Sequence, residues 1–268
     1  MHDNHRNQLS GATRVHFIVG DPIAQVRSPL GVSQAFDQLG MNAIVIPAHV
    51  SPQALAQWHA GVSLAKNVDG IIVTVPHKFA CTALCNTVSE RAQFLGTVNT
   101  MRRNPDGEWH GDMFDGVGYV QALRDKGCEP KGQRALLVGA GGAGSAIAHA
   151  LVTAGVASLD LHDSDVVRRD ALVNRLTGLS LCPVGVGSSD PAGYSLVINA
   201  SPVGMRESDP LPVVVERLDA NAFVGCVITL PVVSPLITAA RARGLGTVTG
   251  TDMFARVRDL MVDFLAQR

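Results

Sequence analysis

A glycine-rich hexapeptide, Gly139-Ala-Gly-Gly-Ala-Gly144, is the stretch whose residue types and spacing point most directly to chemistry. It follows an apolar run at residues 134–138 and precedes an alanine-rich stretch that starts at Ser145. A buried strand, a tight glycine turn and the start of a helix are the context in which this motif binds a dinucleotide. We therefore predict a pyrophosphate site whose residues are Gly139, Gly141, Gly142, Ala143 and Gly144. A tight turn without a ligand is the alternative.

A second predicted strand, residues 158–162, leads to Asp163, which lies about twenty residues beyond the last glycine. A carboxylate at this place accepts hydrogen bonds from the ribose hydroxyls of adenosine and repels a 2′-phosphate. We therefore predict that Asp163 binds the ribose and that the cofactor is NAD rather than NADP. Arg168 and Arg169 follow in the next helix, where they either hold a phosphate or form a solvated face.

Three further clusters contain residues that are able to do proton chemistry or to bind a polar substrate. Lys78 follows the apolar run at residues 71–75, and open α/β folds place ligands at the carboxyl ends of such strands. Asp115 opens a predicted helix, and Ser28 precedes Pro29 at the start of another. Each also has a purely structural interpretation, because an exposed lysine at a helix start and a helix-capping aspartate or serine are both common.

Strand-like and helix-like stretches alternate along the chain, which predicts an α/β fold with mostly parallel sheets. In the first helix, residues 29–39, Ser28 is the expected N-cap and Gly40 lies past the end. A hairpin is expected at residues 98–110, with its turn at 104–107. The other expected elements are strands at 15–19, 43–47, 70–75, 134–138, 158–162, 195–198 and 223–229, and helices at 52–61, 115–126 and 253–266.

A loop at residues 129–132 precedes the nucleotide-binding unit and suggests two domains. We predict a substrate-binding and catalytic domain at residues 1–115, with the C-terminal helix at 251–268 packed back on it. Residues 116–250 form the predicted Rossmann-type NAD(P)-binding domain. The polar residues 1–8 lack the apolar core of a signal peptide and are expected to be a frayed tail.

The composition argues for a small-molecule partner. The net charge is −1, with lysine and arginine scattered, which argues against a nucleic-acid or membrane surface. The chain has five cysteines and no C-x-x-C pair, so we expect reduced thiols and a cytoplasmic protein. Cys81 and Cys85 lie one helical turn apart beside His77, but two buried apolar side chains are the better interpretation, and we predict no metal.

Taken together and in this order, the motifs resemble the shikimate/quinate dehydrogenase family over nearly the whole chain. The match rests on several short segments: GDPIAQVRSP at 20–29, GIIVTVPHK at 70–78, GTVNT at 96–100, GDMFDGVG at 111–118, the glycine turn, INASPVGM at 198–205 and GTDM at 250–253. Several rare tetrapeptides in a fixed order form a strong signal, whereas any one of them would be weak.

The resemblance implies a hydride transfer between a ring hydroxyl of a cyclic hydroxy acid and the nicotinamide, with Lys78 and Asp115 as a catalytic pair across a cleft. A lysine beside an aspartate can orient the hydroxyl and relay its proton, whereas a lone exposed lysine is protonated and a poor base. Substrate-binding positions carried over from the family are Ser28, Thr74 and Asn99. Further cofactor-binding positions are Asn199, Ser201 and Met205.

Four positions depart from the family pattern. Val26 replaces a usual serine and Thr229 a usual tyrosine, both of which serve the substrate carboxylate in the family. Ile72 replaces a usual asparagine, and Val257 a usual glutamine. Each lost hydrogen bond costs on the order of 1 kcal/mol. We therefore expect a less polar pocket that is suited to an analogue of shikimate or quinate.

We thus predict an NAD-dependent dehydrogenase of a small cyclic hydroxy acid, either a monomer or a homodimer. Two alternatives stay open at this point. One is a nucleotide-binding relative that has lost turnover, which the changed pocket favours and the intact Lys78–Asp115 pair opposes. The other is a dehydrogenase of a different small substrate on the same scaffold, such as a folate-carbon oxidoreductase.

Overall fold

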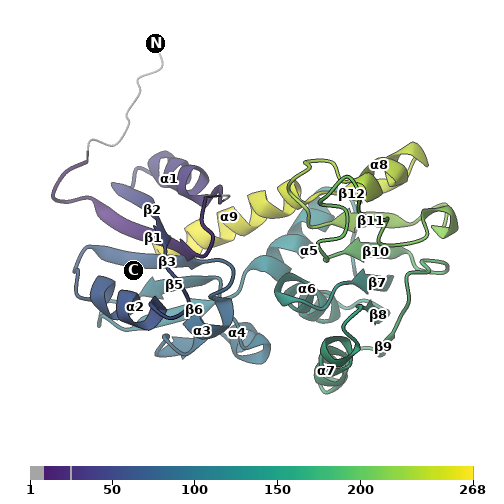
Figure 1. The fold of residues 1–268 in the computed structure, drawn as a ribbon, viewed down its shortest axis with the longest axis horizontal. Coiled ribbons are helices and arrows are strands. Elements are labelled where there is room, and N and C mark those ends of the chain that lie inside the picture. The colour runs from purple at the N-terminus through teal and green to yellow at the C-terminus, as the bar shows by residue number, and fades with distance from the viewer. Residues whose placement is uncertain (1–8, 25, 268) are drawn as a thin grey trace, which may run out of the picture. The chain divides into compact units, whose positions relative to one another are not determined.

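The computed structural model describes residues 9–24 and 26–267, which divide into two compact units. One unit runs up to Phe114 and also includes the residues from Arg258 onward, and the other comprises Asp115–Val257. Each unit contains one sheet with helices beside it (Figure 1). The predicted α/β class with two domains is confirmed. The expected polar tail at residues 1–8 lies outside the described residues.

The first unit contains a mixed six-stranded sheet with the strand order β2-β1-β3-β5-β6-β4. Strand β1 runs parallel to β2 and β3, whereas β5 is antiparallel to β3 and β6. The expected hairpin is therefore confirmed as β5 and β6. The strands are β1 (Arg14–Gly20), β2 (Ala43–His49), β3 (Val68–Val73), β4 (Thr87–Val88), β5 (Thr100–Arg103) and β6 (Trp109–Asp112).

This strand arrangement brings separate segments to one edge of the sheet. Thr100, the first residue of β5, is paired with Ile72 near the end of β3 and with Asp112 at the end of β6. The carboxyl ends of β1, β3 and β6 therefore lie at the same edge as the amino end of β5. Sequence segments around residues 20, 74, 99 and 112 meet there.

The helices of the first unit include α1 (Ser28–Gln38), α2 (Leu55–Ser63), α3 (Lys78–Thr82) and α4 (Glu90–Leu95). Helix α1 buries Val32 and Phe36 completely and is followed by Gly40 with a φ of 69°, as the pattern predicts. The expected N-cap at Ser28 is wrong. The N–H of Gly31 donates to the carbonyl of Arg27 at 3.2 Å, so the helical hydrogen-bond register starts at Arg27, and no side-chain cap bond forms there.

The second unit has an all-parallel sheet with the order β12-β11-β10-β7-β8-β9, which is the strand order of the doubly wound dinucleotide-binding fold. Its direction of winding reverses between β7 and β10, where such folds bind ligands. The strands are β7 (Arg134–Val138), β8 (Ser158–His162), β9 (Val184–Val186), β10 (Leu196–Asn199), β11 (Phe223–Cys226) and β12 (Gly246–Val248).

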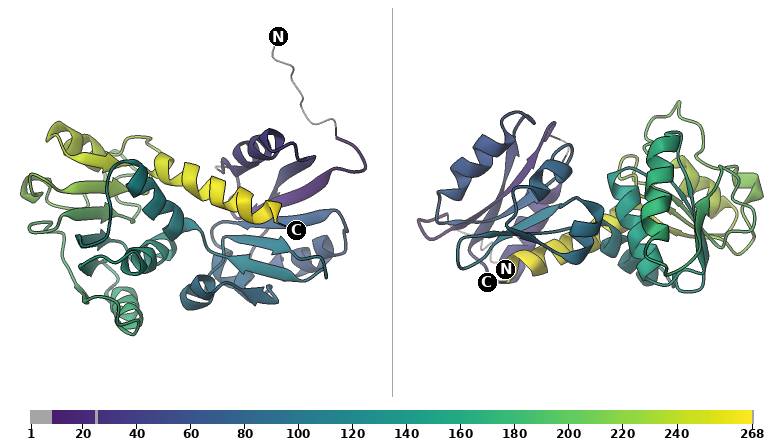
Figure 2. Two further views of the ribbon diagram at one scale, coloured as in Figure 1. Left: turned by 180° about the vertical axis from the view of Figure 1, so that it is seen from behind. Right: turned by 90° about the horizontal axis from the view of Figure 1, so that it is seen from below.

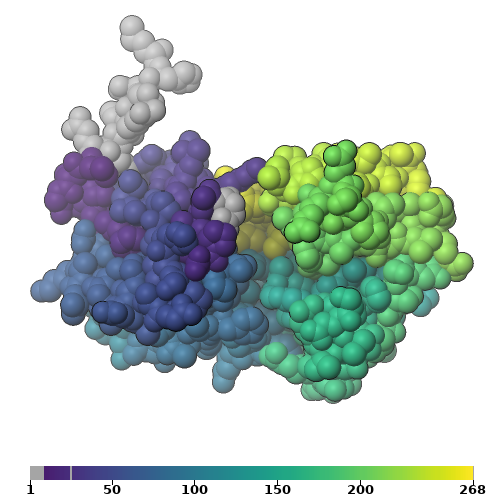
Figure 3. Space-filling view, viewed as in Figure 1, coloured from purple at the N-terminus to yellow at the C-terminus, as the bar shows by residue number. Residues whose placement is uncertain are grey.

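The helices of this second unit are α5 (Asp115–Asp125), α6 (Gly142–Thr153), α7 (Val166–Thr177) and α8 (Pro235–Ala242), with a 3₁₀ turn at Val215–Arg217. Figure 2 shows the sheet and its helices from two further directions, and Figure 3 shows one face of the molecule with all atoms drawn as spheres. The last helix, α9 (Gly250–Ala266), has its first residues in this unit and those from Arg258 in the other. Across the described ranges, no helix combines the length and apolarity needed to cross a bilayer.

Candidate functional site

Backbone hydrogen bonds hold the loops at the edge of the first sheet close together. The N–H of Thr74 donates to the carbonyl of Val19 at 3.0 Å, and the N–H of Val73 donates to the carbonyl of Asn99 at 2.7 Å. A Cβ at Gly20 would crowd the methyl group of Thr74, so the glycine that ends β1 permits this close approach. Thr74 and Asn99, two predicted substrate-binding residues, therefore lie at the ends of neighbouring strands.

Lys78 is held at the same edge by the turn that follows β3. It is the half-buried first residue of α3, and its carbonyl accepts a hydrogen bond from the N–H of Val98 at 3.1 Å. The preceding residue, His77, is 1% exposed and donates from Nε2 to the carbonyl of Val50 at 2.7 Å. No function was predicted for His77 from the sequence. In the structure it anchors the lysine-bearing turn to the loop after β2.

Asn99 is 1% exposed, and its side-chain oxygen is used within the protein. The Oδ1 atom accepts hydrogen bonds from the N–H of Phe114 at 3.1 Å and from the hydroxyl of Thr100 at 3.2 Å. The Nδ2 group is therefore the part of the carboxamide that can donate to an oxygen of a substrate. This polarity suits a hydroxyl or carboxylate oxygen as the partner.

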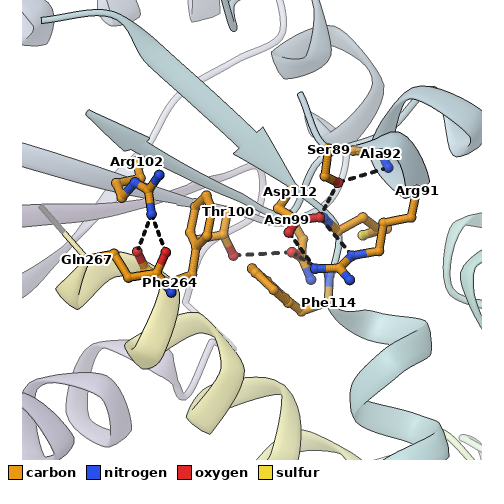
Figure 4. A network of polar contacts seen from close by, with 11 residues as sticks. Ser89, Arg91, Ala92, Asn99, Thr100, Arg102, Asp112, Phe114, Phe264 and Gln267 are labelled. Carbon is orange, nitrogen blue, oxygen red and sulfur yellow. Dashed lines mark hydrogen bonds and ion pairs between the residues drawn. The ribbon is translucent and has the colours of Figure 1, made fainter. Parts of the chain in front are cut away.

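A polar cluster that sequence reasoning did not identify surrounds Asp112 beside Asn99 (Figure 4). The Asp112 side chain is 8% exposed, and Arg91 donates to it from both Nε, at 2.8 Å, and Nη2. Ser89 donates its hydroxyl to the same carboxylate, and the N–H of Met113 does so at 2.7 Å. A buried carboxylate needs such compensation. Asp112 belongs to the predicted motif at 111–118. Its partner Arg91 lies outside every motif, so nothing in the sequence indicated that the two residues pair.

The two remaining predicted residues are buried at the starts of helices. Ser28 is 7% exposed in the first turn of α1. Asp115 is 7% exposed as the first residue of α5, where the helix dipole favours a carboxylate. Asp115 belongs to the second unit and Lys78 to the first, so their pairing stays a prediction.

The glycine turn of the second unit has the shape that its sequence predicts. Gly139 has a φ of 104°, and a Cβ there would lie 2.8 Å from the backbone of Ser201. A Cβ at Gly144 would overlap the carbonyl oxygen of Gly139, whereas Gly141 and Gly142 face open space. Helix α6 begins at Gly142, so its unpaired N–H groups and positive dipole end border this space. These features fit a pyrophosphate group.

Asp163 lies directly after β8, but its carboxylate is already engaged. Oδ2 accepts a hydrogen bond from the N–H of Ala140 at 2.6 Å, which ties the end of β8 to the glycine turn. Oδ1 accepts from the N–H of Asp165 at 2.9 Å and from Nη2 of Arg168 at 2.8 Å. Burial alone would raise the pKa of Asp163, but the Arg168 ion pair and the two N–H donors lower it. The side chain is thus ionised and its charge is matched by Arg168.

The turn after β10 uses the side chains of two further predicted residues for its own folding. Asn199 is 1% exposed, accepts from the N–H and hydroxyl of Ser201 at 3.1 and 2.7 Å, and donates to the carbonyl of Val203 at 3.0 Å. Met205, which is 53% exposed, is the one of these three with a largely accessible side chain.

The cysteines are free thiols in the structure. Burial raises the pKa of Cys81, with a further contribution from Cys85, and burial also raises that of Cys85, each to about 12. Both are therefore neutral near pH 7. Within the described part of the chain, no group of three histidine, cysteine or acidic side chains is placed to hold a metal ion.

Comparison with known proteins places this geometry in a family. The family model of the shikimate dehydrogenase substrate binding domain matches residues 18–101, and a ThiF family model matches residues 126–176. A shikimate dehydrogenase (NADP(+)) from Rubrobacter xylanophilus is 35% identical over 91% of this chain and 87% of its own length. The chain belongs to the shikimate dehydrogenase family. It is thus an NAD(P)-dependent dehydrogenase that acts on a CH–OH group.

Two other members of the shikimate dehydrogenase family show how far the similarity extends. A shikimate dehydrogenase (NADP(+)) from Acidiphilium cryptum is 37% identical over 91% of this chain and 87% of its own length. A crystal structure of shikimate 5-dehydrogenase from Thermus thermophilus, in complex with NADP(H) and shikimate, has 27% sequence identity with this chain. The superposition covers 95% of this chain and 94% of the Thermus chain, with a TM-score of 0.86.

These relatives overturn the predicted preference for NAD. Five curated family members, each at least 31% identical to this chain, are all named NADP(+)-dependent. The prediction treated Asp163 as an uncompensated charge that would repel a 2′-phosphate. In the structure, Arg168 forms an ion pair with that carboxylate, and two backbone N–H groups also donate hydrogen bonds to it. The premise of the repulsion argument is therefore wrong.

Proposed function

We propose that this protein transfers a hydride between a ring hydroxyl of a shikimate-like cyclic hydroxy acid and NADP(H). The observation that carries this proposal is the joint placement of Lys78, Thr74 and Asn99 at one sheet edge in a chain of this family. The unit built from β1–β6 is the proposed substrate-binding domain, and the unit built from β7–β12 is the proposed nucleotide-binding domain. Bound NADP(H) supplies or accepts the hydride. A cytoplasmic location and a monomer or homodimer remain predictions.

In this proposal, Lys78, assisted by Asp115, accepts the proton of the reacting hydroxyl. Oxidation of a carbinol removes the hydroxyl proton together with the hydride, so a group within hydrogen-bond reach must accept that proton. The Lys78 amine holds the hydroxyl and accepts its proton as the hydride leaves, while the Asp115 carboxylate orients the amine and balances the charge of the ammonium that forms. Asn99 donates from Nδ2 to a substrate oxygen, because its Oδ1 is occupied. Thr74 and Ser28 supply hydroxyl groups to the same substrate.

A single substitution tests this assignment. Lys78→Met is expected to lower kcat for shikimate or quinate oxidation by about 10²-fold or more, because positioned proton transfer contributes about 10²- to 10⁴-fold. The melting temperature should stay nearly unchanged, because Lys78 is half-buried at the start of a short helix. Lys66→Met, at an exposed lysine of the same unit, is the control. Wild-type turnover in a folded Lys78→Met protein would contradict the proposal.

For the cofactor, we propose that Arg168 favours NADP over NAD. Its guanidinium is half-exposed and lies on Asp163 at the end of β8, where a ribose is bound in dinucleotide folds. Charge-assisted bonds contribute about 1.5–3 kcal/mol. Arg168→Gln should therefore lower kcat/KM for NADP⁺ by roughly tenfold or more and change that for NAD⁺ much less. Equal losses for both cofactors would show that Arg168 acts only through Asp163.

A further inference from the structure

Arg91 contacts the segment Asp112–Phe114 at both of its ends (Figure 4). Its guanidinium donates twice to the Asp112 carboxylate. The same guanidinium lies over the ring of Phe114, with its carbon 5.0 Å from the ring centroid. Phe114 also packs edge-on against Phe264, at 5.3 Å between ring centroids. One half-buried side chain thus holds a carboxylate and an aromatic ring two residues apart.

Ser89 fixes the helix that carries Arg91. It is the N-cap of α4, where its hydroxyl oxygen accepts a hydrogen bond from the N–H of Ala92 at 3.2 Å. The same hydroxyl donates to Asp112. The N-cap of α4 and its residue Arg91 therefore bind the same carboxylate. These two attachments restrict the orientation of the Arg91 side chain.

The clamped segment determines the orientation of Asn99. The N–H of Phe114 donates to Oδ1 of Asn99 at 3.1 Å, and the carbonyl of Asp112 accepts the N–H of Asn99 at 2.9 Å. A carboxamide rotated by half a turn would place its NH₂ group against the N–H of Phe114, which is repulsive. The position of Phe114 thus decides which end of the Asn99 side chain can reach a substrate.

We propose that Arg91 is a positioning residue, which fixes Asp112–Phe114 and through them the donor end of Asn99 and the chain entering Asp115. The proposal deepens the function proposed above and rests on Asn99 as a substrate-binding residue. In this role Arg91 acts through its contacts with Asp112 and Phe114 rather than on the substrate itself. Lysine cannot replace it, because a point charge cannot bind a carboxylate bidentately and cover a ring at the same time.

The kinetic experiment uses Arg91→Lys and the double variant Arg91→Met/Asp112→Asn. The double variant removes both charges and so avoids leaving a buried unpaired carboxylate. With shikimate and quinate as probes, both variants should raise KM for the acid by about five- to tenfold, as expected when one hydrogen bond is misplaced. KM for NADP⁺ should stay within about twofold. A fall in kcat with both KM values unchanged would indicate only a smaller folded fraction and would overturn the proposal.

Arg14→Met is the matched control. Arg14 binds Asp69 bidentately, with the arginine 31% and the aspartate 19% exposed, compared with 32% and 8% for Arg91 and Asp112. It lies at the amino end of β1, the end of that strand opposite Gly20. This control should leave KM for the acid at the wild-type value. An equal rise in KM for Arg14→Met would overturn the proposal.

A second readout does not depend on turnover. In protein labelled with ¹⁵N-asparagine, the side-chain amide signal of Asn99 is identified by its loss in Asn99→Ala. That signal should shift in both Arg91 variants and stay in place in Arg14→Met. If it stays in place in the Arg91 variants, the proposal is overturned whatever the kinetics. If the wild type oxidises neither probe but the signal shifts, the proposed function fails and the positioning role stands.

Discussion

At the level of single residues, Asp163 shows how a carboxylate in a ligand-binding fold can be structural. It joins the end of β8 to the first residue after Gly139, and it also caps the start of the segment that leads to α7. Its ion pair with Arg168 places a cation at the end of β8, beside the proposed ribose end of the dinucleotide site. Loss of this carboxylate should therefore affect both the folding of the glycine turn and cofactor binding.

We expect Asp163→Asn to lower the free energy of unfolding by about 1–3 kcal/mol at pH 7, because buried donors lose an ionised acceptor. The folded pKa of Asp163 is lowered, so its contribution is present above the ordinary aspartate pKa near 4 and is lost as the pH falls through the folded value. The difference from wild type should shrink below about pH 4 in urea unfolding.

Asp170→Asn is the control for this measurement. Asp170 is 53% exposed in α7, the helix that follows Asp163, and pairs with its neighbour Arg169. Exposed ion pairs contribute about 0–1 kcal/mol, so this change should have little effect. Equal destabilisation by the two substitutions would show that Asp163 does not hold the glycine turn.

At the level of elements, close helix packing positions the start of α5. Gly116, the second residue of this helix, faces the backbone of α6, and a Cβ there would overlap the carbonyl oxygen of Ala146. The same helix carries Asp115 and ends before Gly127, which has a φ of 84°. The glycine therefore sets how near α5 lies to α6, the helix that begins at the dinucleotide turn.

A pair of glycine-to-alanine substitutions tests this packing. Gly116→Ala should destabilise the protein by about 1–3 kcal/mol, because overpacking against backbone cannot be relieved by a rotamer change. Gly61→Ala, in α2 with open space around it, should stabilise by about 0.5–1 kcal/mol through helix propensity. The free energy of unfolding of both variants is the measurement. A neutral Gly116→Ala would mean that α5 and α6 can separate at no cost.

At the level of the whole molecule, we predict that the substrate pocket is less polar than the family pattern. Ile72 is 2% exposed on β3, and Val257 is 5% exposed beside Gly118. Val26 is half-buried and Thr229 is exposed. Three of these four side chains offer a polyhydroxylated acid no hydrogen-bond partner. Membership of the family therefore does not by itself make shikimate the preferred substrate.

We predict that Val26→Ser, Ile72→Asn and Val257→Gln together raise kcat/KM for shikimate. Each restored hydrogen bond contributes on the order of 1 kcal/mol, or about fivefold. A buried amide without a ligand costs about 1–3 kcal/mol, so the free energy of unfolding must be measured alongside kinetics on a panel of cyclic hydroxy acids. A micromolar KM for shikimate in the unchanged protein would contradict this prediction.

Much of the fold and part of the site could be predicted from the sequence, because these features depend on local patterns. Apolar periodicity and the glycines located helix α1, the turn at Gly139 and the strands other than β4, β9 and β12, since backbone conformation and burial follow from neighbouring residues. Lys78 and Asn99 were also identified, because they lie within short motifs in a fixed order. Their placement at one edge follows from the antiparallel pairing of β5 with β3.

Tertiary structure alone decided which charged side chains meet. Arg91 and Asp112 are brought together by the pairing of β4 with β6, and Asn99 meets Phe114 through the register of β5 on β6. Asp163 meets Arg168 only once α7 turns back on β8. Such contacts depend on strand register, helix direction and side-chain rotamers, none of which follows from residue spacing. For that reason the family could be predicted from the sequence, whereas the charge balance around Asp163 could not.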